Sequence, residues 1–121
     1  MSTTVVTEVS ENVTVIEVVE TALCDPEVIA RVAGELSEQL DAMSGRDVVV
    51  DFEPVRYLSS HLLGKLLEFR SALQDRGATM IVCGMRPELE RILNATNLAR
   101  IFHLEPTRKD ALESLDAPDA H

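Results

Sequence analysis

The sequence predicts an α/β fold, with a mostly parallel mixed sheet, an antiparallel edge strand and about four helices. A continuous apolar run at residues 48–50 and a mostly apolar stretch at residues 78–83 are typical of strands buried on both faces of a parallel sheet. Elsewhere, apolar residues recur at three- and four-residue spacing, as they do along amphipathic helices. The resulting order, β-β-α-β-α-β-α-β-α, favours right-handed crossovers between parallel strands.

The composition favours one globular domain. Of the 121 residues, 45% are hydrophobic and 26% are charged, which is ordinary for a folded domain. A chain of this length buries enough surface to fold without disulfides or a metal ion. We expect a single domain over residues 1–115 and a frayed tail over residues 116–121, which contain Pro118 and end in polar residues.

The first part of the chain predicts a hairpin and then a helix. Valine-rich runs lie on both sides of a turn cluster at residues 10–12, so the first run forms the antiparallel edge strand. Asp25 and Pro26 then mark a helix start, as the N-cap and the first helical residue. Apolar residues at helical spacing extend this helix over residues 26–43.

The middle of the chain predicts a strand, a helix and another strand. After the run at residues 48–50, a loop through Pro54 leads to a serine pair and an apolar helical pattern. This second helix is expected over residues 60–75, because Gly77 follows it as a helix stop. The strand at residues 78–83 comes next.

The last part predicts two more helices around one strand. Pro87 begins the third helix, and Asn97 is placed to end it. Apolar residues at 101–104 predict the final strand. Thr107 followed by Asp110 resembles a capping box and predicts a short final helix.

Three loops are the candidate places for function. In parallel α/β sheets, binding sites form at the carboxyl ends of the strands, where helix N-termini also point. Here those loops are residues 23–26, 51–61 and 84–87. We therefore expect them to lie together at one end of the sheet.

The charge balance excludes several partners. There are 11 Lys and Arg against 21 Asp and Glu, so the formal net charge is −10. Phosphate backbones and anionic lipids repel such a chain, which argues against nucleic acid binding and membrane insertion.

The N-terminus lacks the pattern of a secretory signal, and no apolar run has membrane-spanning length. Cys24 and Cys83, far apart and without metal-ligand spacing, are typical of a cytoplasmic protein with free thiols.

Two enzymatic interpretations are weak. Asp51 after a buried strand suggests a response-regulator receiver, but the paired aspartates and the lysine of that chemistry are missing. Ser59, Ser60, His61 and His103 suggest a hydrolase, but there is no G-x-S-x-G motif, and adjacent helical residues point in different directions. We therefore expect no catalysis, no cofactor and no metal site.

The serine pair admits two interpretations. Ser59 or Ser60 caps the second helix, since serine is a favoured N-cap residue. A helix N-terminus also accommodates a phosphate, through its free N–H groups and the positive end of its dipole. Phosphorylation would add a charge of about −1.5 to −2 there, which suits a switch acting on binding more than on fold.

The segment DFEPVRYLSSHLLGKLL, residues 51–67, resembles the signature of the STAS domain family, which includes the bacterial anti-sigma factor antagonists. A second segment at residues 81–102 is similar to another family stretch, and the resemblance spans roughly residues 13–115. The positions that fall at matching spacing in the first segment are Asp51, Val55, Tyr57, Ser60, Leu63 and Gly64.

The resemblance implies a single STAS-like domain and a binding function. An antagonist of this family binds an anti-sigma factor that is also a serine kinase of the histidine-kinase-like ATPase fold, and a sigma factor is released. The kinase phosphorylates the serine that aligns with Ser60, which ends the binding, and a phosphatase restores it. The antagonist itself is a substrate and a binding module. An unpaired edge strand permits a monomer or a weak homodimer.

The resemblance also implies the site. The phosphoacceptor is expected at Ser60, with Ser59 as the weaker candidate. The partner-binding residues are expected at the start of the second helix and in the two loops beside it: Asp25, Asp51, Tyr57, Leu58, Ser59, His61 and Leu62.

Three positions depart from the family pattern. Ser59 replaces the usual aspartate, His61 stands where serine or alanine is common, and Leu62 replaces the usual glycine. Bulk beside the acceptor leaves an alternative open: a non-phosphorylated interaction subunit of a stressosome-like or lipid-transport complex.

Overall fold

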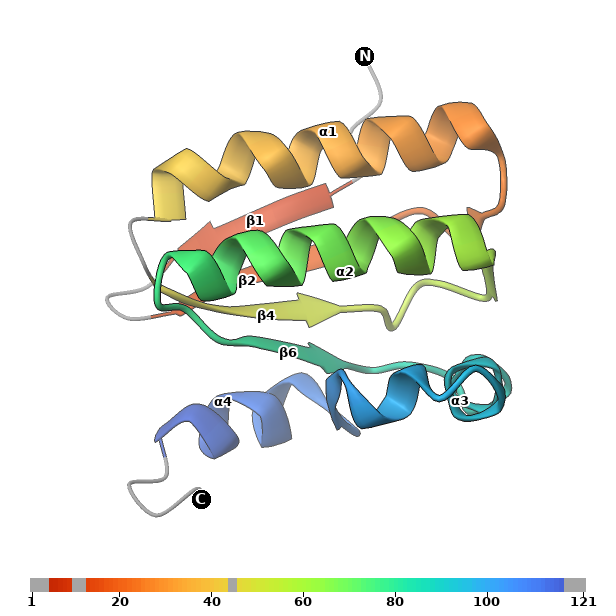
Figure 1. Ribbon diagram of the computed structural model, residues 1–121. Helices are drawn as coiled ribbons and strands as arrows, with labels where there is room; N and C mark the ends of the chain where they lie inside the picture. Colours follow the sequence, from red (N-terminus) through yellow and green to blue (C-terminus); the bar gives the residue numbers. More distant parts are fainter. Residues whose placement is uncertain (1–4, 10–12, 44–45, 117–121) are drawn as a thin grey trace.

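A five-stranded sheet runs through the protein, in the order β1-β2-β4-β6-β7 (Figure 1). The computed structural model describes residues 5–9, 13–43 and 46–116. β1 pairs antiparallel with β2, and the other neighbours pair in parallel. This is the predicted mixed sheet with its antiparallel edge. The strands are β1 (Val5–Val9), β2 (Val13–Val18), β4 (Asp47–Asp51), β6 (Met80–Cys83) and β7 (His103–Glu105).

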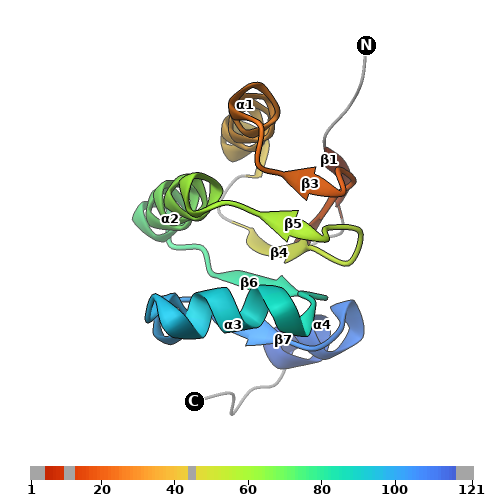
Figure 2. The ribbon, with the colours of Figure 1, turned by 90° about the vertical axis from the view of Figure 1, so that its right-hand side faces the viewer.

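Helices cover both faces of this sheet, unequally. Three of them pack on one face and α4 packs on the other, as Figure 2 shows looking along the strands. None of the helices within the described residues is long and apolar enough to span a membrane. The helices are α1 (Pro26–Met43), α2 (Ser60–Asp75), α3 (Pro87–Ala95) and α4 (Arg108–Asp116).

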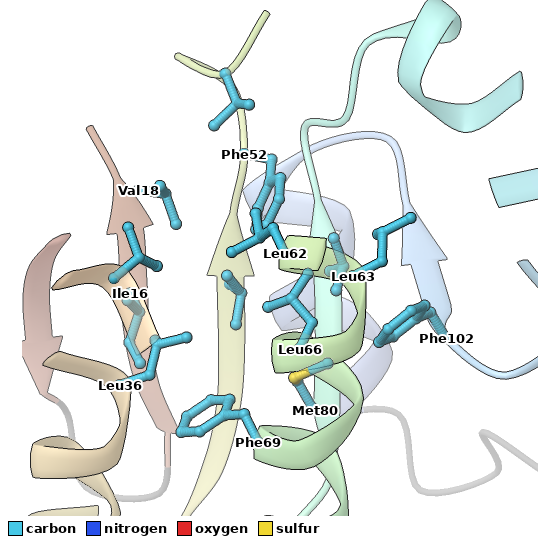
Figure 3. Close-up of a cluster of buried hydrophobic side chains, with 14 of the residues drawn as sticks. Ile16, Val18, Leu36, Phe52, Leu62, Leu63, Leu66, Phe69, Met80 and Phe102 are labelled. Atoms are coloured by element: carbon cyan, nitrogen blue, oxygen red, sulfur yellow. The ribbon is translucent and has the colours of Figure 1, made fainter. Parts of the chain in front are cut away.

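The alternation of side chains along the central strands divides the core in two. In β4, Val48 and Val50 face the three-helix side, whereas Val49 faces α4. On the three-helix side, leucines of α2 such as Leu62 and Leu66 point onto the strands, together with Phe52 (Figure 3). Each fully buried side chain of this size stabilises the fold by about 1.5–3 kcal/mol. This is why β6 and the three residues in the middle of β4 are apolar.

The predicted bounds of the first two helices are confirmed. α1 occupies residues 26–43 and α2 occupies residues 60–75. At the start of α1, the Asp25 Oδ1 atom accepts the backbone N–H of Glu27 at 2.8 Å, as expected of an N-cap. At the start of α4, the Thr107 hydroxyl accepts the N–H of Asp110 at 3.1 Å. Side-chain caps therefore fix both helix starts.

Two short strands were not predicted. β3 (Ala22–Leu23) and β5 (Tyr57–Leu58) pair in parallel as a separate two-stranded sheet beyond the carboxyl ends of β2 and β4. Two residues are too few to show the alternation that identifies a strand in a sequence. Their pairing matters because it joins two of the three candidate loops.

The final strand lies later than predicted. Residues 98–100 form a 3-10 turn, η1 (Leu98–Arg100), and β7 begins only at His103. The C-cap of α3 is Thr96 rather than the expected Asn97, and Asn97 follows it in a left-handed conformation (φ 63°) that turns the chain. Phe102 is buried in the main core without being part of a strand. Burial of its ring explains the apolar run that indicated a strand. Most of the predicted turn and tail, residues 10–12 and 117–121, lies outside the described residues.

The two cysteines occupy opposite environments, which predicts a difference in reactivity. Burial, with the Asp51 carboxylate acting in the same direction, raises the pKa of the Cys83 thiol to about 12, whereas Cys24 is exposed. Because the thiolate is the reactive form, Cys24 should react with Ellman's reagent in the native protein at pH 8 and Cys83 should not. The assay should detect one reactive thiol per chain in the native protein and two after denaturation. In the native Cys24→Ser variant no thiol should react with the reagent, and a rapid reaction of that variant would contradict the prediction.

Candidate functional site

The loops at the carboxyl end of the sheet are held together by the β3–β5 pair. The backbone N–H groups of Arg56 and Tyr57 donate to the Thr21 carbonyl at 2.7 and 3.1 Å, and that of Ser59 donates to the Leu23 carbonyl at 3.0 Å. The turn at Asp25 and the serine pair thus lie side by side at the N-termini of α1 and α2 (Figure 2). This is the clustering that the sequence predicted.

The two serines differ in the accessibility of their hydroxyl groups. Ser59 occupies the N-cap position of α2 with an extended backbone, but its side chain makes no capping hydrogen bond. Its Oγ atom is buried and has no hydrogen-bond partner among the described residues. Ser60 is the first helical residue and its side chain is exposed. Ser59 therefore occupies the expected N-cap position without the usual capping bond, and Ser60 is the exposed residue of the pair.

Exposed side chains surround Ser60. Tyr57 is 63% exposed. Asp25 and His61 are also exposed, and so is Cys24. The side chains of Asp25, Tyr57 and His61 are therefore available to a partner, together with Ser60.

Burial sets three of the predicted contact residues apart. Leu58 alternates with Tyr57 along β5 and points into the core, and Leu62 lies on the inner side of α2 (Figure 3). Asp51 is only 3% exposed. The fold therefore gives these three no surface that a partner could touch in this conformation. Their contribution to the site is to hold the exposed residues in place.

The carboxylate of Asp51 is fully used within the chain. Its Oδ1 atom accepts the N–H of Glu53 at 2.9 Å. Its Oδ2 atom accepts a hydrogen bond from Arg108 Nε at 3.0 Å, and Arg108 Nη2 lies 2.9 Å from the same oxygen as an ion pair. Hydrogen bonds between charged groups of this kind are stronger than those between neutral groups. Asp51 thus connects the start of the serine-bearing loop to α4.

The sequence did not predict that Arg108 takes part in this end of the molecule. Arg108 also contacts Glu17 at 3.3 Å and Glu8 at 3.6 Å. Partial burial works to lower the pKa of the Arg108 guanidinium, but the hydrogen bond and charge of Asp51 and the charge of Glu17 raise it above its ordinary value. Arg108 and Asp51 are 57 positions apart, so no local pattern could have paired them.

Gly84 allows Asp51 to occupy its position. Gly84 has a left-handed backbone (φ 71°), and a Cβ atom there would lie 2.7 Å from Asp51 Oδ1 and 3.1 Å from the Glu53 nitrogen. Only glycine combines this conformation with so close an approach. The third candidate loop therefore contributes space to the site rather than a functional group.

The arrangement does not support the enzymatic interpretations. Asp51 is bound to Arg108, and within the described residues no group of three or more acidic, histidine or cysteine side chains could hold a metal ion. His103 faces α4, where its Nε2 atom lies 2.7 Å from Glu105 and 3.5 Å from the Ser114 hydroxyl. α2, with Ser60 and His61, lies on the opposite face of the sheet. The histidine and the serines are thus not gathered into one site.

A model of the STAS domain family matches residues 4–111. Among solved structures, an anti-sigma factor antagonist from Mycobacterium paratuberculosis is similar with a TM-score of 0.81 and 23% identity, covering 94% of each chain. A STAS domain protein from Planctomyces limnophilus has a TM-score of 0.84 and 18% identity, covering 93% of this chain and 98% of the other.

A third similar structure is the Bacillus cell fate determinant SpoIIAA in its phosphorylated form. Its TM-score is 0.67 and its identity 17%, and the match covers 92% of this chain and 98% of the other. At these identities the structural matches establish the shared fold alone.

Two glycine substitutions separate backbone strain from the close approach to Asp51. Gly77→Ala places a side chain at φ 77° in open space and should cost about 1–2 kcal/mol in free energy of unfolding. Gly84→Ala has the same strain plus the contact with Asp51 and should cost about 1–3 kcal/mol more. Urea denaturation of both variants measures the difference. Equal losses would mean that the loop moves aside at no cost.

Proposed function

Because the chain belongs to the STAS domain family, we propose that it is an anti-sigma factor antagonist that works in the cytoplasm and is switched off by phosphorylation of Ser60. In its unmodified form it binds an anti-sigma factor that is also a serine kinase of the histidine-kinase-like ATPase fold, and this binding releases a sigma factor. A phosphatase reverses the modification. The chain itself acts as binding module and kinase substrate, without catalysis of its own.

One observation carries the assignment to Ser60. Ser60 is an exposed residue at the first position of α2, three positions after the exposed Tyr57, whereas the Ser59 hydroxyl oxygen is buried. A kinase must bring the acceptor oxygen within bonding distance of the γ-phosphorus of ATP. The exposure of Ser60 favours it as the acceptor, and the burial of the Ser59 oxygen disfavours Ser59.

The position also suits a switch that leaves the fold intact. A phosphate on Ser60 would lie at the N-terminus of α2, where free N–H groups and the helix dipole stabilise negative charge. The exposed acidic residues Asp25 and Glu27 lie in the adjoining turn, and the whole chain already has a net charge of −10. Added negative charge there would repel an acidic partner surface. The phosphorylated form of SpoIIAA supports phosphorylation as a modification that this fold accepts.

The proposed docking surface consists of exposed groups around the start of α2. We assign its direct contacts to Asp25, Tyr57, Ser60 and His61, and Ser59 contributes its position at the N-cap. Tyr57 supplies the largest apolar area, and aromatic rings of this kind carry much of the binding energy at protein interfaces. Asp51, Leu58 and Leu62 support this surface from inside.

The alternative function, an interaction subunit without phosphorylation, rests on the bulk of Leu62. The Leu62 side chain is wholly buried in the core, so it adds no bulk to the surface around Ser60. That burial weakens the reason for preferring the alternative. It remains an outcome of the experiments below.

The first experiment identifies the acceptor. Incubation with ATP and the anti-sigma kinase encoded in the same genome should add one phosphate, seen by intact-mass spectrometry. Ser60→Ala should abolish the addition. Ser59→Ala should retain it, as should Ser71→Ala, which alters an exposed serine on the same helix. An unmodified wild-type chain, or loss of the phosphate only in Ser59→Ala, contradicts the proposal. Capture of transporter subunits without a kinase would favour the alternative.

The second experiment tests the consequence of the charge. Ser60→Glu should weaken binding to the kinase at least about tenfold, equal to about 1.4 kcal/mol. The melting temperature should stay unchanged or rise slightly, because an acidic residue in the first helical turn stabilises the helix by about 0.3–1 kcal/mol. Ser71→Glu is the matched control, because it adds the same charge further along α2. Equal weakening by both variants would attribute the effect to net charge rather than to the site.

A further inference from the structure

α2, which begins at Ser60, and α4 lie on opposite faces of the sheet. The side chain of Asp51 nevertheless contacts both the loop that leads to α2 and Arg108 of α4. The Asp51 carboxylate stands at the carboxyl end of β4, with Oδ1 turned to the following loop and Oδ2 turned to α4. Figure 2 shows α4 on the far side of the sheet from α2. The arrangement provides a physical connection from α4 to the loop that ends in the serine pair.

Backbone hydrogen bonds fix the serine-bearing loop at both ends. At its start, the Phe52 N–H donates to the Cys83 carbonyl at 2.9 Å, and the Glu53 N–H donates to Asp51 Oδ1. At its end, the loop is held by the pairing of β5 with β3. A change at Asp51 therefore removes one of the two attachments of the loop, while the β3–β5 pair still holds the other end.

The Asp51 carboxylate depends on Arg108. An ionised carboxylate that is 3% exposed needs a charged or hydrogen-bonded partner, and leaving it unpaired is strongly destabilising. Without the guanidinium, the buried Asp51 carboxylate loses its charged partner, and rotation toward water would restore its solvation. A rotated carboxylate no longer accepts the Glu53 N–H. Loss of the guanidinium therefore weakens the bond at the start of the loop.

The other contacts of Arg108 are weaker. The Glu8 side chain is 78% exposed and lies 3.6 Å from the guanidinium, so its contribution is small. Glu17 is partly exposed and lies at 3.3 Å. α4 itself is seated by buried Ala111 and by Leu112 and Leu115 packed against the sheet. The packing of α4 therefore places the guanidinium next to Asp51, and Asp51 is the main partner of Arg108.

We propose that Arg108 is a positioning residue for the Ser60 site: through Asp51 it holds the loop over residues 52–58, so that the seating of α4 controls the order of the surface on the opposite face. This inference rests on the proposed function for its consequence, but the physical coupling is independent of any kinase. An event that lifts α4 from the sheet would loosen the loop while leaving α2 in place.

The coupling is tested by amide hydrogen exchange, measured by NMR on the whole chain. Arg108→Gln should accelerate exchange of the Glu53 and Ser59 amides at least about tenfold more than it accelerates the amides of the central strands β4 and β6. Lys109→Gln is the matched control, since it removes the same charge from the neighbouring exposed position of α4. It should leave the loop unchanged.

Equal acceleration of all amides would overturn the proposal, because it would make Arg108 a general stabiliser. No acceleration in the loop would overturn it as well. Arg108→Lys keeps the charge but not the guanidinium whose Nε atom bonds to Asp51, and should give the same pattern at smaller amplitude. It carries the test if Arg108→Gln does not fold.

A kinetic experiment tests the consequence for the site. With the anti-sigma kinase and ATP, Arg108→Gln should raise KM for phosphorylation about tenfold with kcat unchanged, because a looser loop must be ordered on binding. Lys109→Gln should leave both constants unchanged. If Arg108→Gln accelerates amide exchange in the loop but the kinase does not phosphorylate the wild type, the coupling holds and the kinase proposal is rejected. If the wild type is phosphorylated efficiently but Arg108→Gln accelerates all amides equally, the kinase proposal holds and the coupling is rejected.

Discussion

The buried carboxylate of Asp51 is the interaction on which this end of the molecule depends. It ends β4, accepts the N–H that starts the next loop, and binds the guanidinium of Arg108. Each of these contacts requires the others, because a buried charge is tolerated only when its oxygen atoms are satisfied. The left-handed Gly84 belongs to the same arrangement, since any side chain there would occupy the space of Asp51 Oδ1.

Local patterns in the sequence predicted the helices, the mixed sheet and the clustering of the loops, but two specific contacts between distant segments were missed. The bounds of α1 and α2 were predictable because periodic apolar residues and local signals, such as Asp25 before Pro26, act within one turn. The β3–β5 pair and the ion pair of Arg108 were not, since each joins segments far apart in the chain. The strand predicted at Phe102 was wrong because an apolar residue that is buried outside a strand cannot be told in the sequence from one within a strand.

Burial divides the serine-bearing segment into two kinds of position. Along β5 the side chains alternate, so Tyr57 faces solvent and Leu58 faces the core. In α2 the helical period turns Ser60 outward and Leu62 inward. The same short segment therefore anchors the fold and forms the surface. A resemblance in sequence marks both kinds of residue together, and only the structure separates those that can touch a partner from those that support the contact.

Two features of the site bear on binding: the restrained loop before Ser60 and the negative charge of the chain. The loop before Ser60 is restrained by hydrogen bonds at both ends, so little conformational entropy is lost when a partner binds it. The chain is acidic, and in the proposed function the exposed ring of Tyr57 supplies the apolar part of the contact. A phosphate at the start of α2 is compatible with the helix, because the helix end stabilises it. The same phosphate adds repulsion where the contact is made, so modification would end binding without unfolding the site.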